Sequence, residues 1–193
     1  MSSADPQHRL GDEERRILLQ LARSSIDAGL LRGAPLTPDP SAYTGELCEH
    51  RTSFVTLRMS DKALRGCIGS TEAVRSLVAD VAYNAWAAAF RDPRFDPLCR
   101  DEFDDVNVHI SVLSPLEPLP AGSEQELLER LRPGIDGLFV REGSRRGTLL
   151  PAVWDMLPDA KRFAYEVRRK AGLPGDYWSA SLSFFRYTAE SFD

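Results

Sequence analysis

The chain has 193 residues, and its 42% hydrophobic and 27% charged content is that of an ordinary globular protein, long enough to bury a substantial core without disulfides. Its 24 basic and 29 acidic residues give a net charge of −5, which disfavours a protein that holds duplex nucleic acid on a basic surface. No apolar run approaches the roughly 18 residues that span a bilayer and the N-terminus has no apolar signal core, so we expect a cytoplasmic protein.

Two helices are predicted in the first half of the chain. Apolar residues recur at three- and four-residue steps from Asp12 onward, and Gly29 and Gly33 are expected to end this helix. A wider apolar face at helical spacing runs over residues 74–89, and Pro93 prevents its continuation. This width indicates a helix that packs across a sheet.

The strands of that sheet are predicted on either side of the second helix. Residues 54–59 and 63–68 are rich in β-forming side chains and are joined by a turn at Asp61-Lys62, so they predict a hairpin. Residues 106–112 alternate valine and isoleucine with polar residues, which predicts a central strand with one apolar and one polar face.

The last third of the chain predicts shorter elements. Ser123 followed by Glu126 forms a capping-box pattern and predicts a short helix through about residue 131. Further elements are strand pieces at 134–140 and 146–150, a helix beginning at Pro151, a helix over 163–171 closed by Gly172, and a last strand at 181–187. Hairpins mixed with helices, without strict βαβ alternation, predict an α+β fold with a mainly antiparallel sheet flanked by helices.

Segment 64–70, Leu-Arg-Gly-Cys-Ile-Gly-Ser, is the strongest candidate for chemistry. It presents Cys67 between two glycines, which allow a tight turn or the close approach of another molecule. The positive charge of Arg65 and a helix N-terminus expected near Ser70 would both favour the thiolate, which is the nucleophilic form of cysteine. A free cysteine is also often buried as a small apolar residue, so a structural role stays open.

The residues on both sides of Cys67 could assist its chemistry. The backbone N–H groups of Ile68, Gly69 and Ser70 could form an anion-binding nest, and Gly66 leaves room for a substrate on the other side. These glycines and Ser70 are therefore predicted to bind substrate.

Arg65 and His109 are the predicted catalytic partners of Cys67. His109 is the one histidine inside a predicted strand, where it occupies the polar face, and it would act as a base if that strand lay beside the strand of Cys67. The alternative is a hydrogen-bonded structural histidine.

Two further groups of polar residues are predicted to bind an anionic substrate. Arg91, Asp92 and Arg94 lie in the turn after the second helix, where an arginine fork could hold a carboxylate or phosphate, or where the three could simply form a local salt-bridge cluster. Arg146 and Thr148 lie beside a predicted hairpin turn, where a solvated hairpin tip is the alternative.

No cofactor or metal is predicted. Cys48 and His50 are close together, but no second pair follows at zinc-like spacing, and the glycine-rich nucleotide motifs, zincin motif and hydrolase elbow are all absent from the sequence. The three cysteines are widely spaced and odd in number, so we expect no disulfide framework and a reducing compartment.

Segment 64–70 also resembles the LRGCIG hexapeptide of the AMMECR domain family, known in bacteria and archaea as AmmeMemoRadiSam system protein A. The resemblance continues in order along the chain, although the family usually has an acidic residue at the position of His109. The further similar blocks are Ala89–Leu98 with its DPRF segment, Ile110–Pro115, Arg146–Trp154, and Lys170–Leu173 followed by Trp178.

This resemblance implies a fold and partners, while the activity of the family is unsettled. It implies an α+β domain over residues 11–193, with a larger and a smaller subdomain and the hexapeptide near a cleft between them. Residues 1–10 are polar and expected to be disordered. The system name implies a Memo-type protein and a radical SAM protein as partners.

Three functions of different classes fit these residues. The first is a small enzyme or catalytic subunit in which Cys67 is a nucleophile or redox thiol and Arg65, Arg91 and Arg94 bind an anionic small molecule or nucleotide. The second is a non-catalytic accessory protein that docks the Memo-type or radical SAM partner. The third is RNA binding through arginines, which the net acidic charge disfavours.

Overall fold

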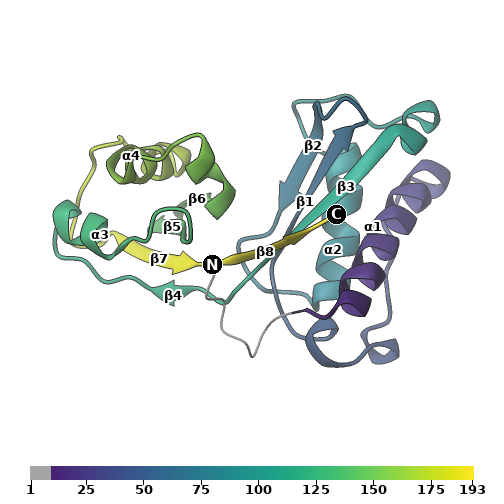
Figure 1. Ribbon diagram of the computed structural model, residues 1–193, viewed down its shortest axis with the longest axis horizontal. Coiled ribbons are helices and arrows are strands. Elements are labelled where there is room, and N and C mark those ends of the chain that lie inside the picture. The colour runs from purple at the N-terminus through teal and green to yellow at the C-terminus, as the bar shows by residue number, and fades with distance from the viewer. Residues whose placement is uncertain (1–9) are drawn as a thin grey trace. The chain divides into compact units, whose positions relative to one another are not determined.

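The computed structural model describes residues 10–193, which divide into two units (Figure 1). Residues 10–113 and 190–193 form the N-terminal unit, and residues 114–189 form the C-terminal unit. Of the segment predicted to be disordered, residues 1–9 lie outside the described residues, whereas Leu10 is buried. None of the described helices is long and apolar enough to cross a membrane.

The N-terminal unit contains a four-stranded antiparallel sheet in the order β2-β1-β3-β8. Its helices α1 and α2 pack against each other and against the sheet (Figure 1). The elements are α1 (Asp12–Arg32), the 3₁₀ turns η2 (Pro40–Ala42) and η3 (Gly45–Leu47), β1 (Ser53–Met59), β2 (Leu64–Gly69), α2 (Leu77–Phe90), η4 (Arg100–Asp105), β3 (Val106–Leu113) and β8 (Ala189–Phe192).

The two faces of this sheet differ because successive side chains of a strand point to opposite sides. Val55 and Leu57 of β1 are fully buried in the core with α1 and α2, together with Ile110 of β3. The intervening residues Thr56 and His109 therefore occupy the opposite face, which we call the polar face of the sheet. The prediction of a central strand with one apolar and one polar face is thus met by β3.

Two glycines of β2 are required by packing. A Cβ on Gly66 would lie 2.1 Å from the backbone oxygen of Ala88 in α2, so only glycine lets the helix approach the strand this closely. A Cβ on Gly69 would lie 2.2 Å from the ring of Phe54, which covers this glycine from the neighbouring strand. Packing within the unit therefore explains why both positions are glycine, without a bound ligand.

A buried carboxylate joins the ends of β1 and β2 to α2. Asp80 has no exposed surface, and its carboxylate accepts hydrogen bonds from the backbone N–H and the hydroxyl of Ser53 at 2.8 and 2.7 Å. It also accepts from the Ser70 hydroxyl at 2.7 Å and from the Asn84 amide at 2.9 Å. Burial raises the pKa of Asp80, while these hydrogen bonds from the serines oppose that shift.

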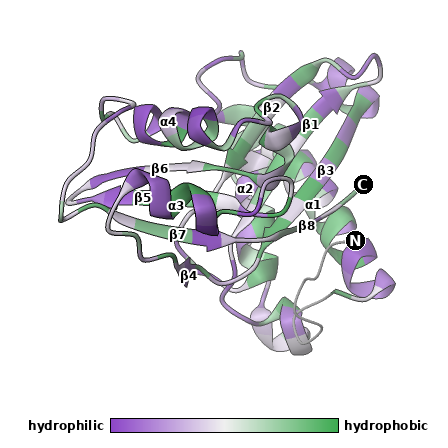
Figure 2. Cartoon of the chain, turned by 60° about the vertical axis from the view of Figure 1, so that its left-hand side comes forward, coloured by the Kyte–Doolittle hydropathy of each residue, from purple (hydrophilic) through white to green (hydrophobic). Residues whose placement is uncertain are grey.

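The C-terminal unit has its own sheet, in the order β4-β7-β5-β6, with α4 packed against β5 and β6. Its core includes the Trp154 and Phe163 rings, which stack with centroids 3.9 Å apart. Figure 2 shows hydrophilic and hydrophobic stretches alternating along α3 and α4, as expected for helices with one buried side. The elements are β4 (Glu117–Pro118), α3 (Glu124–Arg130), β5 (Gly137–Glu142), β6 (Arg145–Leu149), η5 (Pro151–Asp155), α4 (Ala160–Lys170) and β7 (Ser183–Tyr187).

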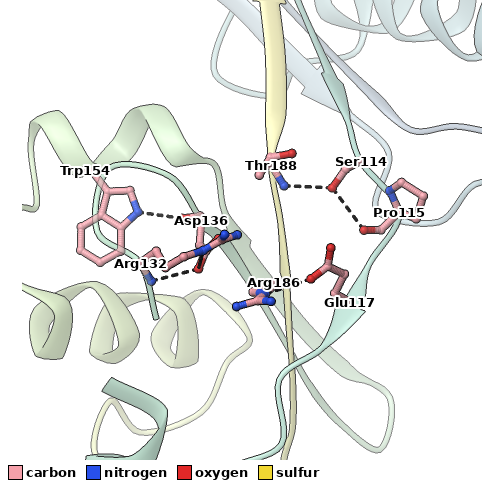
Figure 3. Close-up of polar contacts among 8 residues, drawn as sticks. All are labelled: Ser114, Pro115, Glu117, Arg132, Asp136, Trp154, Arg186 and Thr188. Carbon is pink, nitrogen blue, oxygen red and sulfur yellow. Dashed lines mark hydrogen bonds and ion pairs between the residues drawn. The ribbon is translucent and has the colours of Figure 1, made fainter. Parts of the chain in front are cut away.

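Polar contacts join the loops of this unit to one another and to η5 (Figure 3). The buried Asp136 accepts a hydrogen bond from the Arg132 guanidinium at 2.6 Å, and its backbone oxygen accepts one from the Trp154 indole at 2.7 Å. Where the chain enters and leaves this unit, the Thr188 N–H donates to the Ser114 hydroxyl at 3.0 Å. The segments that enter and leave the unit are thereby paired with each other.

The α+β fold with antiparallel sheets predicted from the sequence is confirmed, with three local differences. Helix α2 begins at Leu77, seven residues after the start expected near Ser70, because Ser76 is the N-cap and Ser70 binds Asp80. Gly29 does not end α1. It lies inside the helix, where Phe90 of α2 leaves no room for a Cβ. Strands β4 and β8 were not predicted.

Replacing Gly66 by alanine tests the close approach of β2 and α2. Because the added methyl would meet a helix backbone that cannot rotate away, we expect Gly66→Ala to lower the free energy of unfolding by about 1–3 kcal/mol, measured by urea denaturation. Gly11→Ala is the control, since its Cβ would meet nothing closer than 3.7 Å. Equal stability of wild type and Gly66→Ala would show that the helix does not pack on β2 as described.

Candidate functional site

Cys67 lies on the edge strand β2 and is half-buried. Because Gly66 faces α2, the side chain of Cys67 points to the polar face of the sheet. There it lies opposite Thr56 of β1, whose hydroxyl donates a hydrogen bond to the cysteine sulfur at 3.1 Å. The sulfur of Cys67 therefore has a hydrogen-bond donor beside it on the polar face.

His109 is not a direct neighbour of Cys67. Strand β1 lies between β2 and β3, and Thr56 is in register with both Cys67 and His109. Two strand spacings amount to about 10 Å, which is too far for a direct hydrogen bond between the cysteine and the histidine. The Nδ1 atom of His109 instead contacts the carboxylate of Asp193. Cys67, Thr56, His109 and Asp193 therefore form a row on the polar face, which we call the polar row.

The backbone of Cys67 is held by Asp92. The carboxylate of Asp92 is buried and accepts a hydrogen bond from the Cys67 N–H at 2.8 Å. It also accepts from the Arg94 guanidinium at 2.6 and 2.9 Å and from the Arg94 N–H at 3.1 Å. The Arg94 guanidinium in turn contacts the Cys67 carbonyl at 3.5 Å. The outward backbone groups of an edge strand are thus occupied at this residue.

This arrangement perturbs the titration of both partners. The Arg94 guanidinium holds the pKa of Asp92 well below its usual range, and the Cys67 and Arg94 N–H groups contribute in the same direction against the cost of burial. The pKa of Arg94 is raised, chiefly by Asp92 and to a smaller extent by negative charge on Cys67. Arg94 is therefore the arginine that lies electrostatically close to the cysteine.

The guanidinium of Arg65 binds Glu102 and not Cys67. Its guanidinium makes two hydrogen bonds to the carboxylate of Glu102 in η4, at 2.7 and 2.9 Å, and a third to the Asp96 carbonyl at 3.0 Å. Arg65 lowers the pKa of Glu102 to about 2. Its role in the described structure is to tie β2 to η4, and the ring of Phe95 lies near both the Arg65 and the Arg94 guanidinium.

The remaining predicted residues around Cys67 are divided between structural contacts and the surface. The Ser70 N–H donates to the Ser53 carbonyl at 3.0 Å, so it is not available to a nest for a bound anion. Gly66 and Gly69 serve the packing described above. Arg91 is exposed, and its guanidinium lies 5.1 Å from the centroid of the Trp86 ring.

Arg146 and Thr148 lie on β6 in the C-terminal unit. Thr148 is buried, and its hydroxyl pairs with the Tyr187 hydroxyl at 2.6 Å and donates to the Leu138 carbonyl at 3.0 Å. Burial raises the pKa of Tyr187, with Thr148 acting in the opposite direction. Arg146 is exposed on the same strand. Thr148 is thus occupied by the core of its own unit.

Metal-binding side chains do not gather in groups of three or more anywhere in residues 10–193. The Cys48 thiol contacts the Pro40 carbonyl at 3.3 Å, and His50 forms an isolated bridge with Ser76. The structure therefore places these two residues in separate local contacts.

Sequence reasoning did not select Thr56, Glu102 or Asp193. The sequence did contain a signal for Thr56, because a hairpin that turns at Asp61-Lys62 places this residue opposite Cys67. The sequence contained no such signal for Glu102 or Asp193. Each of them contacts a residue far away in the chain and lies in a segment without strand or helix periodicity.

Comparisons with known proteins agree on one family. The family model AMMECR1 matches residues 19–192. The chain is 38% identical to a protein of Methanothermobacter thermautotrophicus, with 95% of each chain covered, and 37% identical to one of Thermococcus gammatolerans, with 96% of this chain and 93% of the relative covered. The crystal structure of the uncharacterized protein PH0010 from Pyrococcus horikoshii superposes with a TM-score of 0.84 at 36% identity, covering 94% of this chain and 92% of that one.

The Asp92 contacts predict a specific dependence of stability on pH. The pKa of Asp92 in the folded state lies below its usual 3.8, so the ionised carboxylate stabilises the fold fully when the pH is above 3.8. This stabilisation is lost as the pH falls from 3.8 toward the lowered pKa of the folded state. We expect Asp92→Asn to lower the free energy of unfolding at pH 7 by about 1.5–3 kcal/mol, and the difference from wild type to shrink below about pH 4.

Urea denaturation at pH 7, 5 and 3 measures this effect, with Asp96→Asn as the matched control on the exposed side of the same turn. A difference between wild type and Asp92→Asn that is the same at all three pH values would contradict the ionic role of Asp92.

Proposed function

The chain belongs to the AMMECR1 family, and we propose that it acts as a small enzyme or catalytic subunit in which Cys67 is the nucleophile. One observation carries this proposal: a half-buried thiol points to the polar face of the sheet, accepts a hydrogen bond from Thr56, and has its backbone held by a buried carboxylate. A cysteine kept only for packing would be expected on the helix-covered face instead.

Each neighbour then has a chemical task. Thr56 donates to the sulfur and stabilises its negative charge. Asp92 fixes the strand so that the sulfur keeps its position during reaction. The thiol proton leaves to solvent, because the Thr56 hydroxyl already donates its own proton to the sulfur, and His109 lies two strands away in contact with Asp193. The sulfur electron pair freed in this way adds to a carbonyl carbon of the substrate, the π electrons of that carbonyl move onto its oxygen, and this oxygen takes up a proton from solvent.

An anionic small molecule or nucleotide is the proposed substrate class. Arg94 is half-exposed, and its Nε and Nη2 atoms make all the hydrogen bonds described above, so the two N–H groups on Nη1 remain to bind an anion beside Cys67. Arg91, exposed three residues before it, adds positive charge at the same turn.

A second candidate is a docking protein, for which the same turn supplies the supporting observation. Arg65 and Arg94 are both paired with carboxylates and lie near the Phe95 ring, so the segment 91–95 forms a fixed surface with Arg91 exposed and Phe95 partly exposed. A Memo-type or radical SAM protein is the proposed partner. In that case Cys67→Ser would leave a complex intact, whereas Arg91→Glu and Phe95→Ala would abolish it in a binding assay with the purified partner.

Alkylation by iodoacetamide tests the nucleophile. The variant that keeps only Cys67 (Cys48→Ser, Cys99→Ser) is compared with the variant that keeps only the exposed Cys99 (Cys48→Ser, Cys67→Ser). We expect Cys67 to react roughly threefold faster or more at pH 7 despite its lower exposure, and Thr56→Val to remove most of that advantage, because the thiolate is the reacting form.

Inorganic phosphate serves as the probe for the anion site in the same assay. Slower labelling of Cys67 in millimolar phosphate, absent in Arg94→Gln, is the expected result. Labelling of Cys67 more slowly than Cys99 from pH 6 to pH 9 would overturn the enzyme proposal and leave the docking function.

A further inference from the structure

The N-terminal unit contains a groove that shares no residue with the surroundings of Cys67. This groove of about 510 Å³ lies between the last three turns of α1, the chain at Leu36, and η4. This volume is in the range of pockets that hold a small organic molecule. Its lining combines arginine, aspartate, leucine and phenylalanine side chains from these three segments.

The charge in this groove is positive although the whole protein is acidic. Three arginines line it against a single carboxylate, that of Asp27, which pairs with Arg100. Arg23 donates to the backbone oxygens of Val106 and Phe103 at 2.8 and 3.4 Å, and these carbonyls carry no full charge to balance it. Arg32 has no ion-pair partner in the part of the chain that the structure describes. Two guanidinium charges are therefore left for an anion.

Apolar surface lies directly beside these charges. Leu31, the second-last residue of α1, is 72% exposed, and Leu36, whose N–H donates to the Ser25 hydroxyl at 3.1 Å, also lines the groove. The ring of Phe103 lies between two guanidinium groups, at 4.8 Å from Arg23 and 5.3 Å from Arg100. These contacts hold the ring and the arginines in fixed positions, so the groove is largely formed before any ligand binds.

We propose that this groove binds a small amphipathic anion, with a carboxylate or phosphate group on the arginines and an aromatic or aliphatic body on Leu31, Leu36 and Phe103. Both parts follow from the lining, because arginines that outnumber the single carboxylate lie beside leucine and phenylalanine side chains in one groove. The site is independent of Cys67 and of the proposed function.

Its position suggests which part of the fold the ligand would stabilise. Helix η4 contributes Arg100 and Phe103 to the groove and Glu102 to Arg65, so one short segment contacts both the groove and β2. A ligand in the groove would therefore contact the same segment that binds Arg65.

Binding of 2-naphthoate, with its neutral analogue 2-naphthamide as the matched control ligand, tests the proposal in the intact protein. Backbone amide shifts in ¹⁵N-labelled protein are followed during titration. We expect 2-naphthoate to shift amides of Ser24, Ala28, Arg32 and Phe103 and to bind at least about tenfold more tightly than 2-naphthamide, because only the naphthoate carries a charge for the arginines.

Variants on the same helix separate charge from general surface effects. Arg32→Gln removes an arginine without an ion-pair partner, so it should fold normally and weaken 2-naphthoate binding by about three- to tenfold; Leu31→Ser should weaken both ligands. Arg16→Gln, exposed on the first half of α1, should change nothing. Equal affinity for the two ligands, shifts confined to other amides, or unchanged binding by Arg32→Gln would each overturn the proposal.

Discussion

The hydrogen bond from the Cys67 N–H to the buried carboxylate of Asp92 is the contact on which the rest of the site depends. Strand β2 is an edge strand, and an edge strand has unpaired backbone groups that leave its position poorly determined. Asp92 occupies the outward N–H of Cys67, and Arg94 binds Asp92 and approaches the carbonyl of the same residue. The turn after α2 therefore takes the place of a missing neighbouring strand.

The two faces of β2 make different contacts, which explains why the strand needs glycine at position 66 and a small polar side chain at position 67. Toward the helices, Gly66 lets the backbone of α2 approach, and toward the polar face, Cys67 meets Thr56. A larger residue at 66 would push the strand away from α2, and the contact with Asp92 in the turn that follows this helix would lengthen. Packing on one side of the strand and the position of the thiol on the other are thus linked through a single backbone.

Local patterns in the sequence predicted much of the fold and only part of the site. Helical periodicity placed α1, and alternation placed the β1–β2 hairpin and β3, because these elements follow short-range rules of burial. The four residues of β8 are too short for any alternation and were missed. The partners of Arg65 and His109 were missed for a different reason, since Glu102 and Asp193 are distant in sequence and only the tertiary fold brings them close.

Hydrogen exchange of the Cys67 amide tests most directly whether Asp92 holds this strand. In an edge strand without Asp92 the outward N–H would exchange nearly as fast as an exposed amide. We predict that the Cys67 amide of the wild-type protein exchanges as slowly as the amides of β1, and that Asp92→Asn accelerates its exchange while leaving β3 unchanged. A Cys67 amide that exchanges rapidly in the wild-type protein would contradict the account.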